Sequence, residues 1–283
     1  MQFPSHRRPA ALVLFALLAG CGGATNDVAD PVVDGFICAF RNCTESSTLN
    51  VDEISPRFTA TQNDSDRTIL VEGGLGKSAN VFTAVLPAPG ERLSASVDGG
   101  TEVTMGNPDG KRLDYSAGLT SASAQPVVRV VFTRAGVPNI SEVTMPAGFT
   151  VLQPAAGVAL ARTAGDVDVR LSSTALTTSM ADGTCSRTDG SSFPVKNEIL
   201  PATIQSSVVG GYRLNGAALD DALNLASRSH NNNIVTTPLV SRCQLTVAWR
   251  RTAWGTVAPA MNAHGAIGGY RQALQALTYD GQR

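Results

Sequence analysis

Cys21 has the clearest chemical potential in this sequence. It follows a basic pair, Arg7 and Arg8, an apolar run at residues 10–19, and Gly20. This order of parts is typical of an export signal. The apolar run is too short to be kept as a membrane span, which requires about 20 apolar residues. We therefore expect cleavage between Gly20 and Cys21, which makes Cys21 the first residue of the mature chain.

The four residues that end this signal specify a covalent modification. Residues 18–21 read Leu-Ala-Gly-Cys, which resembles the lipobox of bacterial lipoproteins, whose cysteine thiol is acylated before cleavage. Each buried lipid methylene contributes about 0.8 kcal/mol, and one chain alone holds a protein only weakly. Lipoproteins of this class carry two or three chains, so the resemblance implies a permanent membrane anchor. In this class of lipoproteins, an aspartate directly after the cysteine favours retention in the inner membrane, and this chain has Gly22 at that position. The resemblance therefore implies the outer membrane, facing the periplasm or the cell surface.

Four further cysteines remain after cleavage: Cys38, Cys43, Cys185 and Cys243. An even number in an exported chain indicates two disulfides, and three pairings are possible. We favour Cys38 with Cys43, which closes a short loop, and Cys185 with Cys243, which closes a long one. A zinc site would need paired C-x₂₋₄-C halves, and Cys185 and Cys243 have no such neighbours. We expect no metal and no other cofactor.

The sequence offers few candidates for catalysis. A nucleophilic mechanism needs a serine or cysteine, a base, and an acid that orients the base. The mature chain has two histidines, His230 and His264, and both lie in loop-like sequence. No G-x-S-x-G motif, the mark of many hydrolase nucleophiles, is present. A triad assembled in space, with either histidine as base, stays open as an alternative.

Three motifs resemble ligand sites without meeting the requirements of those sites. Residues 73–78, GGLGKS, have Val71 where a phosphate-binding loop needs glycine, and they lack a strand-to-helix context. A hairpin turn is the expected structure there. The acidic pairs at residues 64–66 and 166–168 offer too few oxygen donors for a calcium loop. They are interpreted as a turn and a strand surface.

Two tryptophans and two aspartates complete the candidates. Trp249 and Trp254 together could form a platform for a sugar ring. A core position is nevertheless the expected one for Trp249, because it lies on a strongly alternating strand. Asp220 and Asp221 are expected on the exposed face of a helix.

Charge and composition restrict the partners. Removal of residues 1–20 takes two of the 22 basic residues and none of the 23 acidic ones, which leaves a small negative net charge. Nucleic acid requires a basic face, so we expect no nucleic-acid partner. The expected membrane contact is the lipid on Cys21.

The elements that position these residues are predominantly strands. From residue 51 onward, short alternating segments are separated by Gly, Pro, Asn and Asp, which is typical of turns between strands. Seven strands are expected in the first half, at residues 57–61, 68–72, 80–86, 92–97, 102–105, 112–116 and 127–133. Their spacing favours an antiparallel sandwich over βαβ units. Residues 135–138 mark the expected domain boundary.

The second half is expected to be similar, with one helix. Strands are expected at residues 142–145, 149–152, 158–161, 167–171 and 242–250. In the last of these, alternate residues from Cys243 to Trp249 share one apolar face. Residues 217–226 carry apolar residues at helical spacing, and residues 229–233 are expected to be a polar loop. Residues 270–279 favour a helix locally.

The second half also resembles a group of uncharacterised Gram-negative outer-membrane lipoproteins. Residues 143–157, VTMPAGFTVLQPAAG, match the group pattern V-T-L-P-x-x-F-T-L-x-x-P-A-x-G. The later parts of the pattern follow in order, as Ala161-Arg162, Gly183-Thr-Cys185, Cys243-Gln-Leu-Thr-Val247 and the basic pair Arg250-Arg251. The similarity covers about residues 140–283 well and residues 51–135 only in texture.

This resemblance implies a fold and no activity. It implies an immunoglobulin-like C-terminal domain, supports Cys185–Cys243 as its core disulfide, and places a final strand near Tyr270. For that reason we expect residues 270–279 to form a strand. The group has no established activity that could be carried over to this chain.

The sequence as a whole predicts a mostly β protein with two antiparallel, immunoglobulin-like β-sandwich domains and one short helix in the second. The expected segments are a signal peptide at 1–20, a lipidated tether with a small disulfide loop at 21–50, and domains at 51–138 and 139–283. We expect a non-enzymatic binding or structural module, tethered to the outer membrane, with a protein or polysaccharide partner. A secreted hydrolase and a carbohydrate- or cell-wall-binding protein are the alternatives.

Overall fold

The computed structural model describes residues 42–282, except 65, 107–113, 164, 174–176, 201, 206–207 and 232–237. Gly20, Cys21 and Cys38 lie outside the described residues, and so do the signal peptide and lipid site predicted there. The described chain is mostly β and contains one α-helix, α2 (Gly216–Asn231). No described helix has the length and apolar character that a membrane span requires.

A ten-stranded sheet, here called sheet A, runs through the whole molecule. Its strand order is β1-β4-β3-β2-β18-β17-β13-β14, with β7 paired to β3 and β11 paired to β18. Its strands are β1 (Asn42–Glu45), β2 (Ile54–Asn63), β3 (Thr68–Lys77), β4 (Asn80–Leu86), β7 (Tyr115–Thr120), β11 (Val158–Ala161), β13 (Thr178–Arg187), β14 (Ser192–Ile199), β17 (Val240–Trp254) and β18 (Ala266–Asp280).

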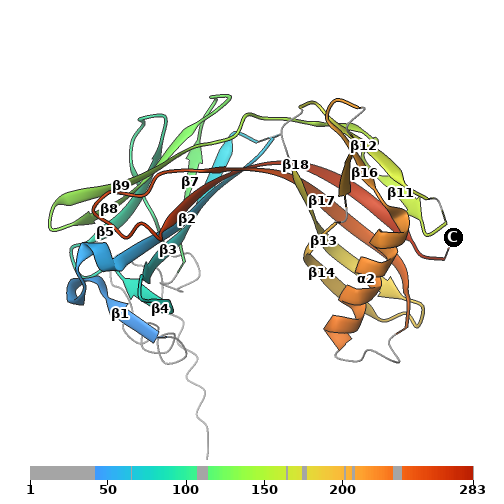
Figure 1. Ribbon diagram of the computed structural model, residues 1–283, viewed down its shortest axis with the longest axis horizontal. Coiled ribbons are helices and arrows are strands. Elements are labelled where there is room, and N and C mark those ends of the chain that lie inside the picture. The colour runs from blue at the N-terminus through green and yellow to red at the C-terminus, as the bar shows by residue number, and fades with distance from the viewer. Residues whose placement is uncertain are drawn as a thin grey trace, which may run out of the picture.

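Strands β17 and β18 join the two halves of the molecule. They form one continuous antiparallel pair, from Arg242 opposite Asp280 to Trp254 opposite Gly268. The first half of β18 pairs in parallel with β2, and its last residues pair in parallel with β11. In Figure 1 these two strands arch across the molecule, with a lobe descending at each end.

Two smaller sheets pack on the same side of sheet A, one in each lobe. Sheet B has the order β6-β5-β8-β9 and sheet C the order β10-β12-β16-β15. Sheet B consists of β5 (Arg92–Val97), β6 (Val103–Thr104), β8 (Val127–Arg134) and β9 (Val137–Thr144). Sheet C consists of β10 (Val151–Gln153), β12 (Val167–Leu171), β15 (Ala202–Gln205) and β16 (Gly211–Leu214). Each lobe is therefore a β-sandwich, as the sequence predicts.

Each lobe has its own hydrophobic core. The first core includes Phe58 of β2, Phe132 of β8 and Ile267 of β18. The second includes Trp249 of β17, Leu277 of β18 and Leu223 of α2, so the helix closes this core together with sheet C. Burying one such large apolar side chain contributes roughly 1.5–3 kcal/mol, which is why the alternating strands place these residues inward.

The two faces of sheet A are distinct. One face, here called the core face, carries the residues of both cores. The opposite face, here called the open face, carries the alternate residues of the same strands, because successive side chains of a strand point to opposite sides. On β17, Thr246, Thr252 and Trp254 of the open face are exposed, whereas Val247 and Trp249 of the core face are buried. Sheets B and C lie on the outer side of the arch, so the open face lines its inner side (Figure 1).

The predicted domain boundary requires correction. Residues 135–136 form the tight turn between β8 and β9, and residues 137–138 already belong to β9, which pairs with β8 along its whole length. Thus β9, predicted to open the second domain, belongs to the first lobe. Residues 266–272 of β18, far beyond that turn in the chain, also pair with β2 of the first lobe. The division into 51–138 and 139–283 therefore fails, because the chain returns to its first lobe near its end.

The end of the predicted tether also requires correction. Residues 42–45 form β1 and pair in parallel with β4. Ser46 is buried, and Leu49 is part of the first core. Residues 42–50 therefore pack on the first lobe, and only residues before 42 are left for a tether.

The helix and the last strand are decided by the fold. Helix α2 extends to Asn231, so the first part of the predicted polar loop at 229–233 is helical. Residues 270–279 lie within β18, which confirms the predicted strand against its local helical preference. Pairing with β17 along the full length of this segment outweighs that weak preference, because tertiary context routinely overrides helix propensity.

Candidate ligand-binding face

The Cys185–Cys243 disulfide is present and joins neighbouring strands. Cys185 of β13 and Cys243 of β17 are directly opposite in the register, with Cα atoms 4.0 Å apart. Both belong to the second core, which confirms the pairing predicted for them. Cys43 is disulfide-bonded, and Cys38, the partner predicted for it, lies outside the described residues.

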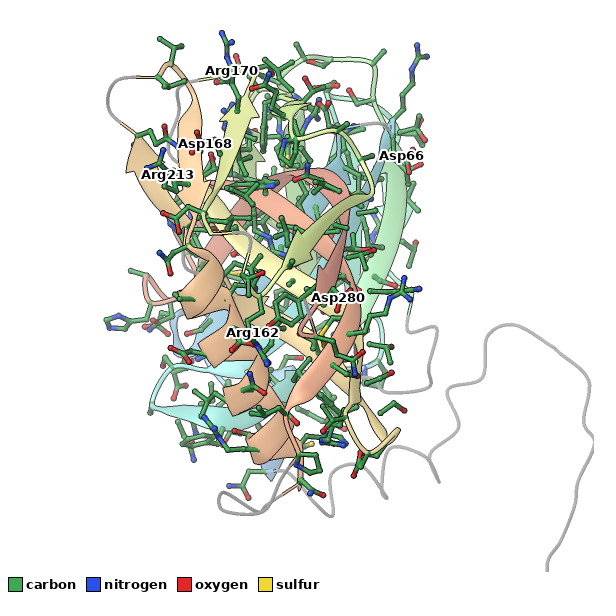
Figure 2. All side chains as sticks on the ribbon, turned by 90° about the vertical axis from the view of Figure 1, so that its right-hand side faces the viewer. Asp66, Arg162, Asp168, Arg170, Arg213 and Asp280 are labelled. Carbon is green, nitrogen blue, oxygen red and sulfur yellow. A yellow bond between two sulfur atoms is a disulfide. The ribbon has the colours of Figure 1, made fainter. Side chains whose placement is uncertain are left out.

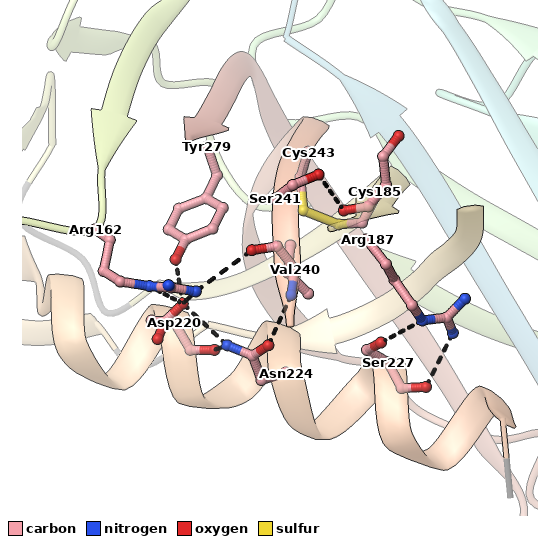
Figure 3. The surroundings of a disulfide bond; sticks show 11 residues. Arg162, Cys185, Arg187, Asp220, Asn224, Ser227, Val240, Ser241, Cys243 and Tyr279 are labelled. Atoms are coloured by element: carbon pink, nitrogen blue, oxygen red, sulfur yellow. Dashed lines mark hydrogen bonds and ion pairs between the residues drawn. A yellow bond between two sulfur atoms is a disulfide. The ribbon is translucent and has the colours of Figure 1, made fainter. Parts of the chain in front are cut away.

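The first aspartate of the Asp220-Asp221 pair is not an exposed helix residue. Figure 3 shows Asp220 of α2 beneath Tyr279 and Arg162. Its Oδ1 accepts hydrogen bonds from Arg162 Nε and Nη2 (3.1 and 2.9 Å) and from the Tyr279 hydroxyl. Asn224, one turn later, donates a hydrogen bond from Nδ2 to the same oxygen, and its Oδ1 accepts a hydrogen bond from the backbone N–H of Val240. Asp220 therefore holds the helix to β17 and β18, which corrects the predicted exposed position.

A second polar contact fixes the other end of the helix. Arg187, at the end of β13, donates from Nε to Ser227 Oγ (2.8 Å) and from Nη2 to the Ser227 carbonyl (3.1 Å). Its guanidinium also lies 4.6 Å from the Phe193 ring centroid. The polar residues around the disulfide thus anchor α2 at two points (Figure 3) and do not form an open site.

The two histidines lie far from any catalytic arrangement. His230 is exposed near the end of α2, with its ring 6.2 Å from that of Phe193. His264 is exposed in the turn before β18. Among the described residues, no hydrogen bond joins either imidazole to a serine or a carboxylate. The base that the hydrolase alternative needs is therefore not assembled in the described part of the chain.

The remaining motifs are structural. Residues 73–77 continue β3 and pair with β2, so the glycine-rich segment is a strand where the sequence predicts a turn. Gly73 is required there, because a Cβ atom would lie 2.0 Å from the Arg57 carbonyl oxygen. Asp168 forms an exposed ion pair with Arg213 (2.8 Å), seen at the upper left of Figure 2. The described residues hold no cluster of three or more His, Cys, Asp or Glu side chains that could bind a metal.

The two tryptophans occupy opposite faces of β17. Trp249 lies on the core face, is 0% exposed and contacts the ring of Tyr212 at a centroid distance of 5.3 Å. This confirms its predicted core position. Trp254 lies on the open face and is 70% exposed. A platform made from both residues is therefore excluded, and Trp254 alone is available to a ligand.

A second aromatic ring lies beside Trp254. A Cβ atom placed on Gly268 would be 3.1 Å from the Tyr270 hydroxyl oxygen and 3.3 Å from Cζ3 of Trp254. Gly268 stands directly opposite Trp254 in the β17–β18 register, and Tyr270 is the next residue of β18 on that face. Both rings therefore converge over one glycine, whose missing side chain lets them lie close to the sheet.

Arg250 extends this aromatic pair along the open face. Its guanidinium carbon lies 5.1 Å from the Tyr270 ring centroid, within the range of a cation–π interaction. Its Nε is buried and has no hydrogen-bond partner among the described residues. No described carboxylate forms an ion pair with Arg250. The guanidinium therefore adds a positive charge, not neutralised by a described ion pair, to a row of two aromatic rings.

The row Trp254, Tyr270 and Arg250, here called the aromatic row, has polar neighbours. Thr252 lies directly opposite Tyr270 on one side, and Thr61 of β2 is its partner on the other. Gln272 lies between Arg250 and Asn63 in the same way. Gln272 is buried, at 8% exposed, so the hydroxyl groups of Thr252 and Thr61 are the polar neighbours considered for a ligand. An aromatic surface flanked by hydroxyl groups can stack on the apolar face of a sugar ring and hydrogen-bond its hydroxyls.

The sequence indicates only one member of this row. Trp254 is apparent as a candidate by residue type. Tyr270, Arg250 and Gly268 come together only through the register of β17 with β18. The pair Gly268-Gly269 inside a strand was the available signal, since glycine within a strand often marks a close approach of other groups.

Comparison with known proteins assigns no family to this chain. No family model matches the chain, and no curated protein sequence matches it. A chimeric titin Z1Z2 carrying a KLER peptide from decorin is 11% identical, with a TM-score of 0.23 over 83% of this chain and 100% of that one. Titin domains Z1Z2 in complex with telethonin are 10% identical, with a TM-score of 0.22 and the same coverage. Extracellular domains 3–5 of Drosophila OTK are 11% identical, with a TM-score of 0.18 over 82% of this chain and 66% of that one. The fold class rests on the strand pairings and the two cores.

Proposed function

We propose that this chain is a lipid-anchored binding protein of the outer membrane, and that its open face binds a polysaccharide of the cell envelope. The anchor is the lipobox at residues 18–21. The observation that carries the binding role is the convergence of Trp254 and Tyr270 over Gly268. Most soluble proteins bury tryptophan to a large degree, so an indole 70% exposed beside a second ring is a feature that calls for a ligand.

The chemistry of the row favours a sugar polymer over a protein partner. Protein interfaces of standard size bury about 800 Å² on each partner around an apolar centre. The neighbours of Tyr270 on the two adjacent strands are instead hydroxyl side chains, namely Thr252 and Thr61. Arg250 gives the face a preference for sugars that carry acidic groups, since guanidinium pairs well with carboxylates and phosphates.

Affinity electrophoresis tests this proposal. The full chain, solubilised in detergent, is run in native gels containing either alginate, a polymer of uronic acids, or dextran, a neutral glucan. We expect alginate to retard the protein more than dextran does. Trp254→Ala should raise the dissociation constant for alginate, obtained from the retardation at several polymer concentrations, at least tenfold, which is about 1.4 kcal/mol. The reason is that truncating a central aromatic anchor removes much of the binding energy.

Matched variants make the result specific. Phe82→Ala removes another exposed aromatic ring, 81% exposed on β4 and distant from the aromatic row, and should leave the retardation unchanged. Arg250→Gln should reduce the difference between the retardation by alginate and the retardation by dextran. Unchanged retardation of Trp254→Ala, or no retardation by either polymer, would refute the binding role.

The anchor is tested separately. Cys21→Ser should abolish labelling of the protein by radioactive palmitate and release it from the membrane fraction. Membrane retention of this variant would contradict the anchor and leave the binding result untouched.

A further inference from the structure

A polar layer separates the two hydrophobic cores on the core face of sheet A. It consists of Gln62 of β2, Arg271 of β18 and Arg251 of β17, which stand side by side in the register. The first core ends before this layer and the second begins after it. The continuous strands β17 and β18 thus carry two neighbouring arginines through the middle of the molecule.

Both arginines are deeply buried. Arg251 is 5% exposed and Arg271 is 7% exposed. Arg271 donates from Nη1 to the Gln62 side-chain oxygen, and the guanidinium of Arg251 lies 4.0 Å from the Phe149 ring centroid. Three buried nitrogen atoms have no hydrogen-bond partner among the described residues, namely Nε and Nη2 of Arg251 and Nε of Arg271.

The positive charge of this layer exceeds the nearby negative charge. The acidic group that acts on Arg251 is Asp64, whose Oδ1 accepts a hydrogen bond from the backbone N–H of Phe149 (3.1 Å). A Cβ atom on Gly148 would lie 2.8 Å from this oxygen and 3.0 Å from Arg271 Nη2, so both groups approach the same glycine. Neither arginine forms an ion pair with a described carboxylate. Burial lowers the pKa of Arg251, and the charge interactions with Tyr212 and then Asp64 offset part of that effect.

A pocket opens next to the polar layer. It has a volume of about 240 Å³, and its walls include Asp64, Thr150, Ala273 and Gln275. Ala273 and Gln275 follow Arg271 on the core face of β18, and Thr150 follows Phe149. The pocket lies along the part of β18 between its pairing with β2, which ends at Gln272, and its pairing with β11, which begins at Leu277.

We propose that a small oxyanion, such as phosphate or a carboxylate, binds to Arg251 and Arg271 in this layer and enters through the pocket. A buried charge without a partner is strongly unfavourable, and an anion that accepts hydrogen bonds from the three unpartnered nitrogens would offset that cost. The site is on the core face, so it is separate from the aromatic row. The proposal does not depend on the proposed polysaccharide binding.

Calorimetric titration of the full chain with inorganic phosphate, and separately with acetate, tests the site. We expect a saturable heat for at least one of these anions at constant ionic strength. Arg271→Gln, which removes one of the two guanidinium groups, should weaken binding at least tenfold. Arg242→Gln removes an exposed arginine of the neighbouring strand β17 and should bind as the unmodified protein does.

The thermal midpoint provides a second readout. Phosphate stabilises many proteins non-specifically through exclusion from their surface, and that effect is not saturable. Specific binding should add a saturable rise in the unmodified protein and in Arg242→Gln, and no such rise in Arg271→Gln. If Arg271→Gln does not fold, Arg271→Lys retains the charge without Nε and should show weakened saturable binding. No saturable heat with either anion, or equal binding by the Arg271 variants, would overturn the proposal.

Discussion

The hydroxyl of Tyr279, near the end of β18, donates a hydrogen bond to Asp220 on helix α2. Arg162 Nη2 donates to the same oxygen at 2.9 Å. Tyr279 is almost completely buried, and Asp220 and Arg162 are partly exposed. This contact joins the last strand of the chain to the helix that closes the second core, so its loss should be felt throughout the second lobe.

The first prediction concerns alkaline pH. Burial, with a further contribution from the hydrogen bond to Asp220, raises the pKa of Tyr279 to about 12 from an ordinary value of about 10. Between these two values the folded chain retains a proton that the unfolded chain releases. Stability from this group is therefore fully present below about pH 10 and is lost as pH rises to about 12. Tyr279→Phe should show a shallower fall of the thermal midpoint across this range.

Tyr270→Phe is the control for this experiment. It also removes one phenol hydroxyl, but it keeps Tyr279, so it should show the same steep fall as the unmodified protein. Equal slopes for Tyr279→Phe and the unmodified protein would show that the phenol of Tyr279 does not contribute the pH dependence.

The second prediction compares two ion pairs. Arg162→Gln should lower the free energy of unfolding by about 2 kcal/mol, because it leaves the partly buried carboxylate of Asp220 without its cation. Arg213→Gln breaks an exposed pair with Asp168 and should cost less than about 1 kcal/mol. Figure 2 shows Arg213 beside Asp168 and Arg162 elsewhere, near the helix. Urea unfolding of both variants measures the difference, and similar losses would contradict the role assigned to Asp220.

The third prediction concerns cooperativity between the lobes. Because β17 and β18 contribute to both cores, the two lobes should unfold together. Phe132→Ala, in the first core, should cost about 3 kcal/mol. With Trp254→Phe as background, Trp249 becomes the single tryptophan and reports on the second core. We expect the urea midpoint reported by Trp249 fluorescence to fall in Phe132→Ala, and the fall should account for the whole loss in free energy of unfolding.

Independent lobes would give a different result. In that case Trp249 fluorescence would keep its midpoint in Phe132→Ala, while far-ultraviolet circular dichroism would show an additional transition at lower urea. Leu245→Ala, in the second core, is the positive control, because it must shift the Trp249 midpoint in either case.

Local patterns in the sequence were sufficient for many of the elements. The strands expected at 80–86 and 92–97 coincide with β4 and β5, because their turn residues and alternation are unambiguous. Trp249 and the Cys185–Cys243 bond were predicted correctly. The core position of Trp249 follows from the period-2 alternation of β17, and the disulfide follows from the even number of cysteines together with the group resemblance. Strands β13 to β16 were not predicted, because their sequence is polar and lacks a clear apolar face.

The candidate site was predictable only in part. Trp254 was identified by residue type, whereas Tyr270 and Arg250 are 16 and 4 residues from it in the chain and belong to no ligand-binding motif. Their contact depends on the register that sets Trp254 opposite Gly268. A shift of one residue in that register would move every side chain to the other face, so neither the aromatic row nor the buried arginine layer exists without it.

The sequence by itself determined the β character of the chain and the inward face of β17, and it predicts an export signal with an acylation motif. These follow from local rules, namely alternation, turn chemistry and the order of charged, apolar and small residues. Only the tertiary structure decided that β18 passes between the lobes, pairing with β2 at one end and β11 at the other. A strand's alternation specifies which side chains are buried and not which strand becomes its neighbour, because that choice depends on packing between residues far apart in the chain.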